Sequence, residues 1–424
     1  MDAKPTNPQT PRTSNTSESF HKQSSTKRVF LGMSGGVDSS VSAILLKEQG
    51  YDITGIYMKN WSKDLPGMKC PWAEDLADAK RVAVQLDLDF EIWDFEQAYK
   101  QEVVDYMLAE FQKGRTPNPD VICNELIKFK LFYDQAVSRG ADYIATGHYA
   151  RTGVIAPQIA TRTTASPTAA SNAILDSAST TLLRARDENK DQTYFLYRMS
   201  DIATARTLFP VGSLTKPEVK ALAQKHGLDV ATKKESMGVC FVGEVGMKDF
   251  LKEYLDTQPG EIREREADTI LGYHDGAIFY TIGQRHGLYL GGGLPYYVVA
   301  KDLARNIVYV SKNLNHSDLW TRELPLEDLH LRNGLTLDDL TRIPNLQVRL
   351  RHRAPLLSVK AQVTPNAQSK FTNTNTSLAQ SVNPPASAST LALRFSDLIK
   401  RPAPGQSAVL YSGETCLGGG IITE

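Results

Sequence analysis

The chain has 424 residues, of which 41% are hydrophobic and 23% are charged. This length allows two or three domains, each with a core of its own. Lys and Arg together number 48 and are balanced by 48 Asp and Glu residues. There is thus no global positive field, and a nucleic-acid partner would have to bind a local basic surface. No apolar segment approaches the roughly 18 residues of a membrane span, which favours a soluble protein with no membrane partner.

The cysteine content and the N-terminal segment indicate the compartment. Cys70, Cys123, Cys240 and Cys416 are too few and too scattered for a secreted disulfide scaffold, and no CxxC pair suggests structural zinc. Residues 1–27 are rich in Ser, Thr, Asn, Gln and Pro and lack the apolar core of a signal peptide. We therefore expect a disordered tail and a cytoplasmic protein. A transit peptide is the alternative, because acidic residues are sparse in this segment.

From Arg28 onward, apolar strands alternate with amphipathic helices, which predicts an α/β domain with a doubly wound parallel sheet over residues 28–250. The expected strands are 29–33, 53–58, 90–93 and 143–146. Helices are expected after Val37, along the stripe of Leu76, Val82 and Leu86, and over 125–137, 191–200 and 216–226.

The second half of the chain is expected to be β-rich. Residues 251–317 predict a small central domain with strands at 277–281, 296–300 and 307–310. Residues 318–424 predict a β-barrel with strands around 346–351, 356–363, 391–395 and 406–411. Two stretches of small polar residues, about 155–180 and 364–390, are interpreted as flexible insertions within these domains.

The strongest local motif is a glycine-rich loop between the first strand and the first helix. It consists of Gly32, Met33, Ser34, Gly35, Gly36, Val37, Asp38 and Ser39. Glycines let the backbone approach an anion closely, and the serine hydroxyls add donors beside the free amides of the helix. The sequence lacks both GxxxxGK[ST] and GxGxxG, which disfavours a phosphate-transferring P-loop and a dinucleotide fold. A glycine turn that merely caps a helix is the structural alternative.

SGGVDS resembles the signature of the ATP pyrophosphatases, which cleave ATP to AMP and pyrophosphate while adenylating an oxygen of a second substrate. The resemblance implies ATP as cosubstrate and Mg²⁺ with it, with Asp38 organising the metal-bound pyrophosphate. No separate cluster of metal-ligating side chains is predicted. The loop leaves the acceptor open, since amidating, ligating and thiolating enzymes share it.

Two cysteines lie in segments suited to chemistry. Cys123 follows Thr116-Pro117-Asn118-Pro119-Asp120 and directly precedes an expected helix, whose dipole would favour the thiolate. Cys240 lies in a stretch of small residues, 236–243, where the backbone can approach a substrate. Either cysteine alone would be read as structural, but together with an ATP-activating loop they indicate sulfur chemistry.

The chain resembles the tRNA-specific 2-thiouridylases across almost its whole length. The resemblance is carried by a series of motifs in family order: residues 32–39, Met58-Lys59-Asn60-Trp61, Thr116-Pro117-Asn118-Pro119-Asp120 with Cys123-Asn124, Ala145-Thr146-Gly147-His148-Tyr149-Ala150, Lys190-Asp191-Gln192-Thr193-Tyr194-Phe195-Leu196, Gly238-Val239-Cys240-Phe241 and Thr281-Ile282-Gly283-Gln284-Arg285. The tail and the two polar insertions depart from the family pattern but touch none of these motifs. Cys70 and Cys416 fall outside them and are interpreted as structural.

This resemblance implies a role for each matching residue. Gly32 to Ser39, Met58 and Gly147 would bind ATP, and Asn118, Pro119 and Asp120 would contact the target base. Cys240 would carry sulfur as a persulfide, supplied by a sulfur-relay protein or a cysteine desulfurase, and Cys123 would be the nucleophile. The implied tRNA contacts are His148, Lys190, Asp191, Gln192, Arg351, His352 and Gln406.

The chemistry of thiolation supports two thiols on independent grounds. Adenylation turns the oxygen of the uracil C2 carbonyl into a leaving group, which a persulfide can displace. A second cysteine can then release the sulfur by forming a disulfide with the first. Because Cys123 and Cys240 are far apart in sequence, we expect a mobile loop around Cys240.

A basic segment near the C-terminus is a candidate for RNA binding. Residues 347–353 alternate as in a strand, which would place Arg349, Arg351 and Arg353 on one face, where they could bind phosphates. A solvated edge strand is the alternative. Two other functions remain open: an ATP pyrophosphatase that aminates a small molecule, and a nucleotide-sensing module without turnover. Neither would need the two cysteine motifs.

Overall fold

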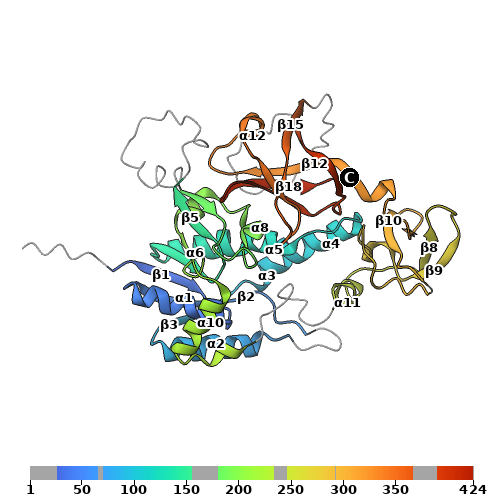
Figure 1. Cartoon of the computed structure of the whole chain (residues 1–424). Helices are drawn as coiled ribbons and strands as arrows, with labels where there is room; N and C mark the ends of the chain where they lie inside the picture. Colours follow the sequence, from blue (N-terminus) through green and yellow to red (C-terminus); the bar gives the residue numbers. More distant parts are fainter. Residues whose placement is uncertain are drawn as a thin grey trace, which may run out of the picture.

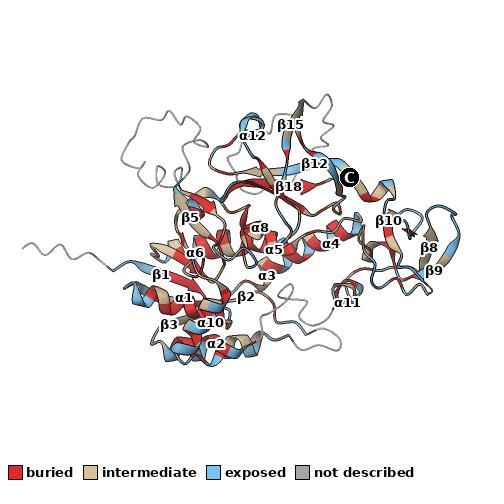
Figure 2. Cartoon of the chain, in the orientation of Figure 1, coloured by how far each residue is buried: buried red, intermediate tan, exposed pale blue. Residues whose placement is uncertain are grey.

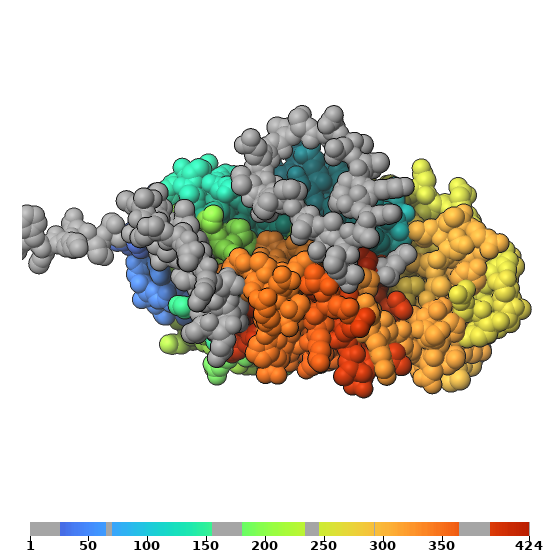
Figure 3. Space-filling view, turned by 90° about the horizontal axis from the view of Figure 1, so that it is seen from above, coloured from blue at the N-terminus to red at the C-terminus, as the bar shows by residue number. Residues whose placement is uncertain are grey.

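The computed structural model describes residues 26–64, 70–154, 180–233, 246–291, 293–365 and 389–423. They form three sheets. Figure 1 shows the C-terminal sheet above the N-terminal α/β domain, with the small central sheet at the right. Seen from above, the C-terminal strands lie between the other two parts (Figure 3). Among these described residues, no helix combines the length and apolar character needed to cross a lipid bilayer.

The first sheet is parallel, in the order β3-β2-β1-β4-β7. Its strands are β1 (Arg28–Gly32), β2 (Asp52–Lys59), β3 (Asp89–Asp94), β4 (Tyr143–Thr146) and β7 (Thr207–Leu208). Its principal helices are α1 (Val37–Glu48), α2 (Trp72–Gln85), α3 (Glu96–Tyr99), η1 (Lys100–Val104), α4 (Asp105–Gln112), α5 (Pro119–Ile122), η2 (Cys123–Leu131), α6 (Phe132–Ser138), α8 (Thr193–Leu196), α9 (Asp201–Ala205), α10 (Lys216–Lys225) and η4 (Asp229–Thr232).

Helices cover both faces of this sheet. Apolar residues of α1, α2 and α10 form one core with the strands, and those of η1, α4, η2 and α6 form the other. The buried residues concentrate along the strands and the inward faces of these helices (Figure 2). The predicted doubly wound α/β domain is therefore confirmed.

Strand order reverses between β1 and β4. The chain proceeds outward from β1 to β3 and then crosses to β4 on the other side of β1. In open α/β sheets, ligands bind at the carboxyl ends of the strands beside such a switch point. The glycine-rich loop follows β1, and Gly147 follows β4, so both lie at this point.

The remaining strands form two further sheets, as the β-rich second half predicted. The central sheet, in the order β10-β11-β8-β9, contains β8 (Gly260–Glu264), β9 (Ile270–His274), β10 (Tyr297–Asp302) and β11 (Ile307–Ser311), and follows α11 (Met247–Lys252). The C-terminal barrel-like sheet contains β12 (Trp320–Leu331), β13 (Gln347–Arg349), β14 (Leu357–Ser358), β15 (Lys360–Pro365), β16 (Ser389–Lys400), β17 (Ser407–Ser412) and β18 (Thr415–Ile422), with α12 (Leu337–Arg342) beside it. The α/β domain adds the hairpin of β5 (Arg151–Val154) and β6 (Thr180–Leu183), which pairs with β18.

Several local predictions were wrong. Residues 277–281 contain a 3-10 helix, η5 (Ala277–Phe279), instead of a strand. The helix expected over 191–200 is only α8, and the one expected from Glu125 begins at Pro119, where proline suits the first turn. Residues 1–25, 155–179, 234–245 and 366–388, which include the tail, Cys240 and most of both insertions, lie outside the described residues.

Candidate nucleotide and uridine site

The glycine-rich loop turns sharply into α1. Gly35 has φ +72°, and a Cβ there would lie 2.2 Å from the backbone oxygen of Asp75, so only glycine fits. The Ser34 amide donates to Ser39 Oγ at 3.3 Å, and the Ser39 hydroxyl donates to the Gly36 carbonyl at 3.1 Å. The loop therefore brings backbone amides and hydroxyls to the N-terminus of a 12-residue helix, which suits a polyphosphate.

Two other predicted ATP residues pack directly against this loop. A Cβ at Gly147 would lie 2.6 Å from Ser39 N and 2.8 Å from the Asp38 carbonyl carbon. A Cβ at Gly32 would lie 2.9 Å from Met58 Cε. Gly147 therefore lets β4 approach the start of α1, and Met58 closes the other side at the end of β2.

Asp38 is held by two donors that the motif does not contain. Its Oδ1 accepts from the Tyr149 hydroxyl at 2.9 Å and from Lys216 Nζ at 2.6 Å. Among the described residues no donor reaches its Oδ2, and no three His, Cys, Asp or Glu side chains lie together as a metal site. One free carboxylate oxygen beside a phosphate loop fits Mg²⁺ bound chiefly through ATP.

Gln192 holds Tyr149, and through it Asp38, in place. Its Oε1 accepts from the Tyr149 backbone amide at 2.8 Å, and the Gln192 backbone amide donates to the Tyr149 carbonyl at 2.9 Å. Tyr149 is 2% exposed. The side chain of a predicted tRNA contact therefore fixes the tyrosine that holds Asp38.

The C-terminal sheet positions the loop that precedes Cys123. The Thr116 amide donates to the Pro404 carbonyl at 2.8 Å, and Gln406 Nε2 donates to the Thr116 carbonyl at 2.7 Å. Gly405 has φ +90°, and a Cβ there would lie 2.9 Å from Thr116 N. Gln406, predicted as a tRNA contact, therefore tethers the segment expected to bind the base.

Tyr194 joins a predicted base contact to a predicted tRNA contact. Burial raises its pKa, while a hydrogen bond with the Asn118 side chain and the charge of Arg351 oppose this shift. Its hydroxyl donates to the Ser407 carbonyl at 3.1 Å. Tyr194 thus hydrogen-bonds both Asn118 of the α/β domain and Ser407 of the barrel, within reach of the charge of Arg351.

Cys123 lies inside a helix, which corrects the expectation that it precedes one. The helix begins at Pro119 and continues through the π-helical segment η2, so the helix dipole acts on Cys123 less than predicted. Cys123 is 3% exposed. The adjacent Asn124 donates from Nδ2 to the Phe195 carbonyl at 3.2 Å.

The Cys123 helix contacts the end of β4 through His148. The rings of Phe129 and His148 have centroids 5.7 Å apart, and His148 Nδ1 is 2.9 Å from Thr146 Oγ1. Burial and the charge of Lys128 hold the pKa of His148 well below its usual value, so the ring is neutral near pH 7. Burial raises the pKa of Asp120, and Lys128 opposes this. Lys128 therefore lies near both residues.

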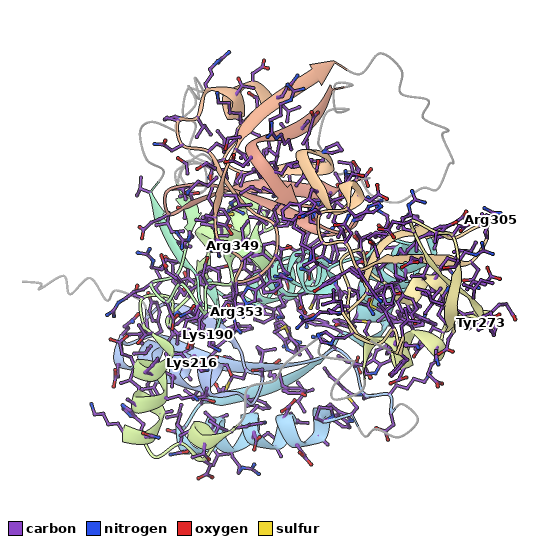
Figure 4. The ribbon with its side chains drawn as sticks, turned by 45° about the vertical axis from the view of Figure 1, so that its right-hand side comes forward. Lys190, Lys216, Tyr273, Arg305, Arg349 and Arg353 are labelled. Carbon is purple, nitrogen blue, oxygen red and sulfur yellow. The ribbon has the colours of Figure 1, made fainter. Side chains whose placement is uncertain are left out.

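The prediction that Arg349, Arg351 and Arg353 share one face of a strand was wrong. Strand β13 ends at Arg349, and the chain then turns. Arg349 is buried and donates to Asp191 Oδ2 at 2.6 Å, while Arg351 is exposed. Arg353 donates to the Asn189 carbonyl at 2.9 Å. Figure 4 shows Arg353 and Lys190 between Arg349 and Lys216.

His352 lies on the Phe195 ring, with centroids 4.6 Å apart, and burial with Arg353 lowers its pKa to about 4. The side chain of Asp191 is fully buried and also accepts from Thr193 Oγ1 at 2.9 Å. In this conformation Asp191 joins the α/β domain to the barrel.

Family models match most of the chain. Residues 27–244 match the tRNA methyl transferase HUP domain, residues 248–312 the tRNA methyl transferase PRC-barrel domain, and residues 374–422 the aminomethyltransferase beta-barrel domain. The chain is 43% identical to tRNA-specific 2-thiouridylase MnmA 1 of Geobacillus kaustophilus, over 94% of this chain and 96% of the relative. The chain belongs to the tRNA-specific 2-thiouridylase family.

Other members of the family match a similar share of this chain. Identity is 42% to tRNA-specific 2-thiouridylase MnmA of Pseudomonas entomophila and 40% to that of Listeria monocytogenes, each over 93% of this chain and 94% of the relative. The resemblance inferred from the motifs is thereby confirmed.

The structure groups the predicted thiouridylase residues around one edge of the sheet. The phosphate loop, Gly147, His148 and the Cys123 helix are connected by direct contacts, and the barrel approaches through Gln406 and His352. Cys240 lies outside the described residues. Sequence reasoning missed Tyr149, Tyr194 and Lys216 as supports. The two tyrosines stand inside quoted motifs, but nothing in the sequence distinguishes Lys216 from other helix-start lysines.

Proposed function

We propose that this protein is a tRNA-uridine 2-sulfurtransferase. It adenylates the C2 oxygen of the wobble uridine with ATP and replaces that oxygen with sulfur, giving 2-thiouridine, AMP and pyrophosphate. The supporting observation is the contact path from the phosphate loop through Gly147 and His148 to the Cys123 helix. This path brings nucleotide chemistry and thiol chemistry to one site.

In the first step the loop amides and Ser39 hold the phosphates, and Asn118 and Asp120 orient the uracil. The C2 oxygen attacks the α-phosphorus, and the bond to the bridging oxygen breaks with its electron pair going to pyrophosphate. Asp38 would hold Mg²⁺ that arrives with ATP, and the ion would supply neutralisation of the charge on the phosphates. Tyr149 keeps the Asp38 carboxylate in place.

In the second step the terminal sulfur of a Cys240 persulfide attacks C2, and AMP leaves. The Cys123 thiolate then attacks the inner sulfur of Cys240, so that the S–S bond breaks and its electron pair stays with the sulfur on the base. A Cys123–Cys240 disulfide results, which an external thiol reductant returns to two thiols. Because Cys123 is 3% exposed, this exchange requires that the residues covering the Cys123 side chain move when tRNA binds.

The decisive experiment is mass spectrometry of tRNA nucleosides after incubation with ATP, Mg²⁺, unmodified tRNA and a cysteine desulfurase with cysteine, which supplies sulfur at the persulfide level. We expect 2-thiouridine in amounts that match AMP formation. ATP consumption without 2-thiouridine would favour an amidating synthetase, and no ATP consumption would favour a nucleotide-binding module. A methylated base would instead support the activity named in the family-model descriptions.

Asp38→Ala should abolish pyrophosphate release while leaving the tRNA dissociation constant nearly unchanged. The reason is that Asp38 lies at the phosphate loop, whereas the tRNA contacts lie toward the barrel. Pyrophosphate release and tRNA binding by filter retention measure the two effects. A loss of tRNA binding would show that the two substrates are misplaced in this scheme.

The enzyme would obtain sulfur from a sulfur-relay protein or a cysteine desulfurase, and it would work in a reducing cytoplasm. Supporting this, two cysteines within the described ranges, Cys70 and Cys416, are free thiols.

A further inference from the structure

The phosphate loop contains no cation of its own. Between Gly32 and Ser39 the one charged side chain is Asp38, which is negative. Phosphate-transferring P-loops carry a lysine that reaches the terminal phosphates of the nucleotide. Any positive charge that the protein adds to that of Mg²⁺ at the departing pyrophosphate must therefore come from another part of the chain.

Lys216 brings one ammonium group to the loop from the first residue of α10. Its Nζ is 2.6 Å from Asp38 Oδ1 and 5.9 Å from the centre of the Tyr149 ring, and its side chain is 9% exposed. A capping box between Thr215 and Glu218 fixes the start of this helix. The ammonium group is therefore held beside the N-terminus of α1.

Lys233 brings a second ammonium group to the same loop. Its Nζ donates to the Gly35 carbonyl at 3.3 Å and to Asp75 Oδ1 at 2.7 Å, and it also binds Asp78. Burial opposes its charge, but the hydrogen bonds to Asp75 and Asp78 raise the pKa of Lys233. It is therefore a cation at all physiological pH values.

Both lysines belong to one packed unit. Val219 and Ala223 of α10, and Val230 and Ala231 of η4, share a core with α1. In Figure 4, Lys216 lies beside the α/β sheet, below Lys190 and Arg353. Two cations thus reach the loop from a segment nearly two hundred residues later in the chain.

We propose that Lys216 and Lys233 bind the β- and γ-phosphates of ATP and stabilise the pyrophosphate that leaves. This inference rests on the proposed function, since it assigns the charge that adenylation requires. As the α–β bridging bond breaks, its electron pair moves onto the β-phosphate, where the two ammonium groups lie. Asp38 and Asp75 hold these groups in place before the nucleotide arrives.

Lys216→Met and Lys233→Met test the proposal, with Lys220→Met as a matched control because Lys220 is exposed on the same helix. We expect each of the first two variants to lower kcat for AMP formation by about 100-fold, as for loss of one charge-stabilising donor. Pyrophosphate binding, measured by calorimetry with pyrophosphate and Mg²⁺, should weaken at least about tenfold. Lys220→Met should match the wild type, and all variants should keep the tRNA affinity and Tm.

A purely structural role for Lys216, such as orienting Asp38, has a distinct signature. In an Asp38→Asn background, Lys216→Met should weaken pyrophosphate binding further, and Lys216→Arg should restore part of the affinity. If Lys216→Met has no effect in that background, or if both single variants bind pyrophosphate like the wild type, the proposal is overturned. Failure of the proposed function is distinguishable, because the wild type would then form neither AMP nor 2-thiouridine.

Discussion

At the scale of single residues, Gly147 decides whether the nucleotide loop can form. Because a Cβ there would lie 2.6 Å from Ser39 N, Gly147→Ala must displace the start of α1 or the end of β4. Overpacking of this kind costs about 1–3 kcal/mol. We expect at least a tenfold rise in KM for ATP, measured in steady-state AMP formation.

Gly291→Ala is the matching control for this substitution, because a Cβ at Gly291 would meet open space. It should leave KM for ATP unchanged. Equal kinetics for the two variants would mean that the loop adjusts freely and that Gly147 has no special role.

At the scale of elements, the turn before β17 sets the position of the segment predicted to bind the base. Gly405→Ala should push Thr116 away, since a Cβ at Gly405 would lie 2.9 Å from Thr116 N. The segment 116–120 would shift with Thr116, whereas the phosphate loop, which Gly405 does not contact, would keep its position. We expect KM for tRNA to rise about tenfold while ATP binding is retained, a combination that separate titrations can measure.

Gly413→Ala separates this contact from backbone strain. Gly413 also has a positive φ, +57°, but a Cβ there would meet open space. The Gly413→Ala protein should lose some stability and keep its KM for tRNA. A similar rise in KM for both variants would assign the effect to strain in the barrel instead.

At the scale of the whole molecule, the ion pair of Asp191 with Arg349 joins the α/β domain to the barrel. Both side chains are at least 95% buried, and Nη1 lies 2.6 Å from Oδ2. Asp191→Asn leaves Arg349 without its counter-charge, which typically costs about 3–5 kcal/mol. We expect a markedly lower midpoint of urea unfolding.

Two comparisons make this prediction specific. Asp191→Asn combined with Arg349→Met should recover part of the loss, because the buried charge of Arg349 is removed together with its partner. Arg351→Met, at an exposed position close by, should keep the unfolding midpoint and weaken tRNA binding. An Asp191→Asn protein as stable as the wild type would contradict a joining role for the pair.

Buried histidines should make the whole molecule acid-sensitive. Burial, with Arg332 and Arg198, lowers the pKa of His330 to about 4. The unfolded chain protonates this ring near pH 6.5, so it binds more protons than the native state below that pH. The free energy of unfolding should therefore fall as the pH is lowered from 6.5 to 4. For this group the decrease is at most about 1.4 kcal/mol per pH unit.

His330→Gln should flatten the acid limb of a stability-against-pH curve measured by urea unfolding. His286→Gln, at an exposed position, should leave the curve as it is. Parallel acid limbs for the wild type and His330→Gln would show that His330 is already protonated in the native state.

Local patterns predicted most elements of the α/β domain. The strand at 143–146 was predicted at its observed bounds, and that after Arg28 within one residue. Residues 277–281 were predicted as a strand because they are apolar, but Gly276, with φ +154°, turns the chain into a 3-10 helix. The alternation at 347–353 suggested one strand, yet Arg353, with φ +61°, lies in a turn. In both cases a backbone turn overrode the side-chain pattern.

The sequence by itself determined the family and the doubly wound domain, and it predicted the phosphate loop, the reactive thiols and the base-binding residues, because each is encoded in neighbouring residues. Tertiary structure alone decided which side chains support them. Lys216 reaches Asp38, Gln406 tethers Thr116, and Arg349 turns inward to a buried carboxylate. These contacts join residues more than 150 positions apart, and they depend on how sheets and helices pack, which spacing along the chain does not contain.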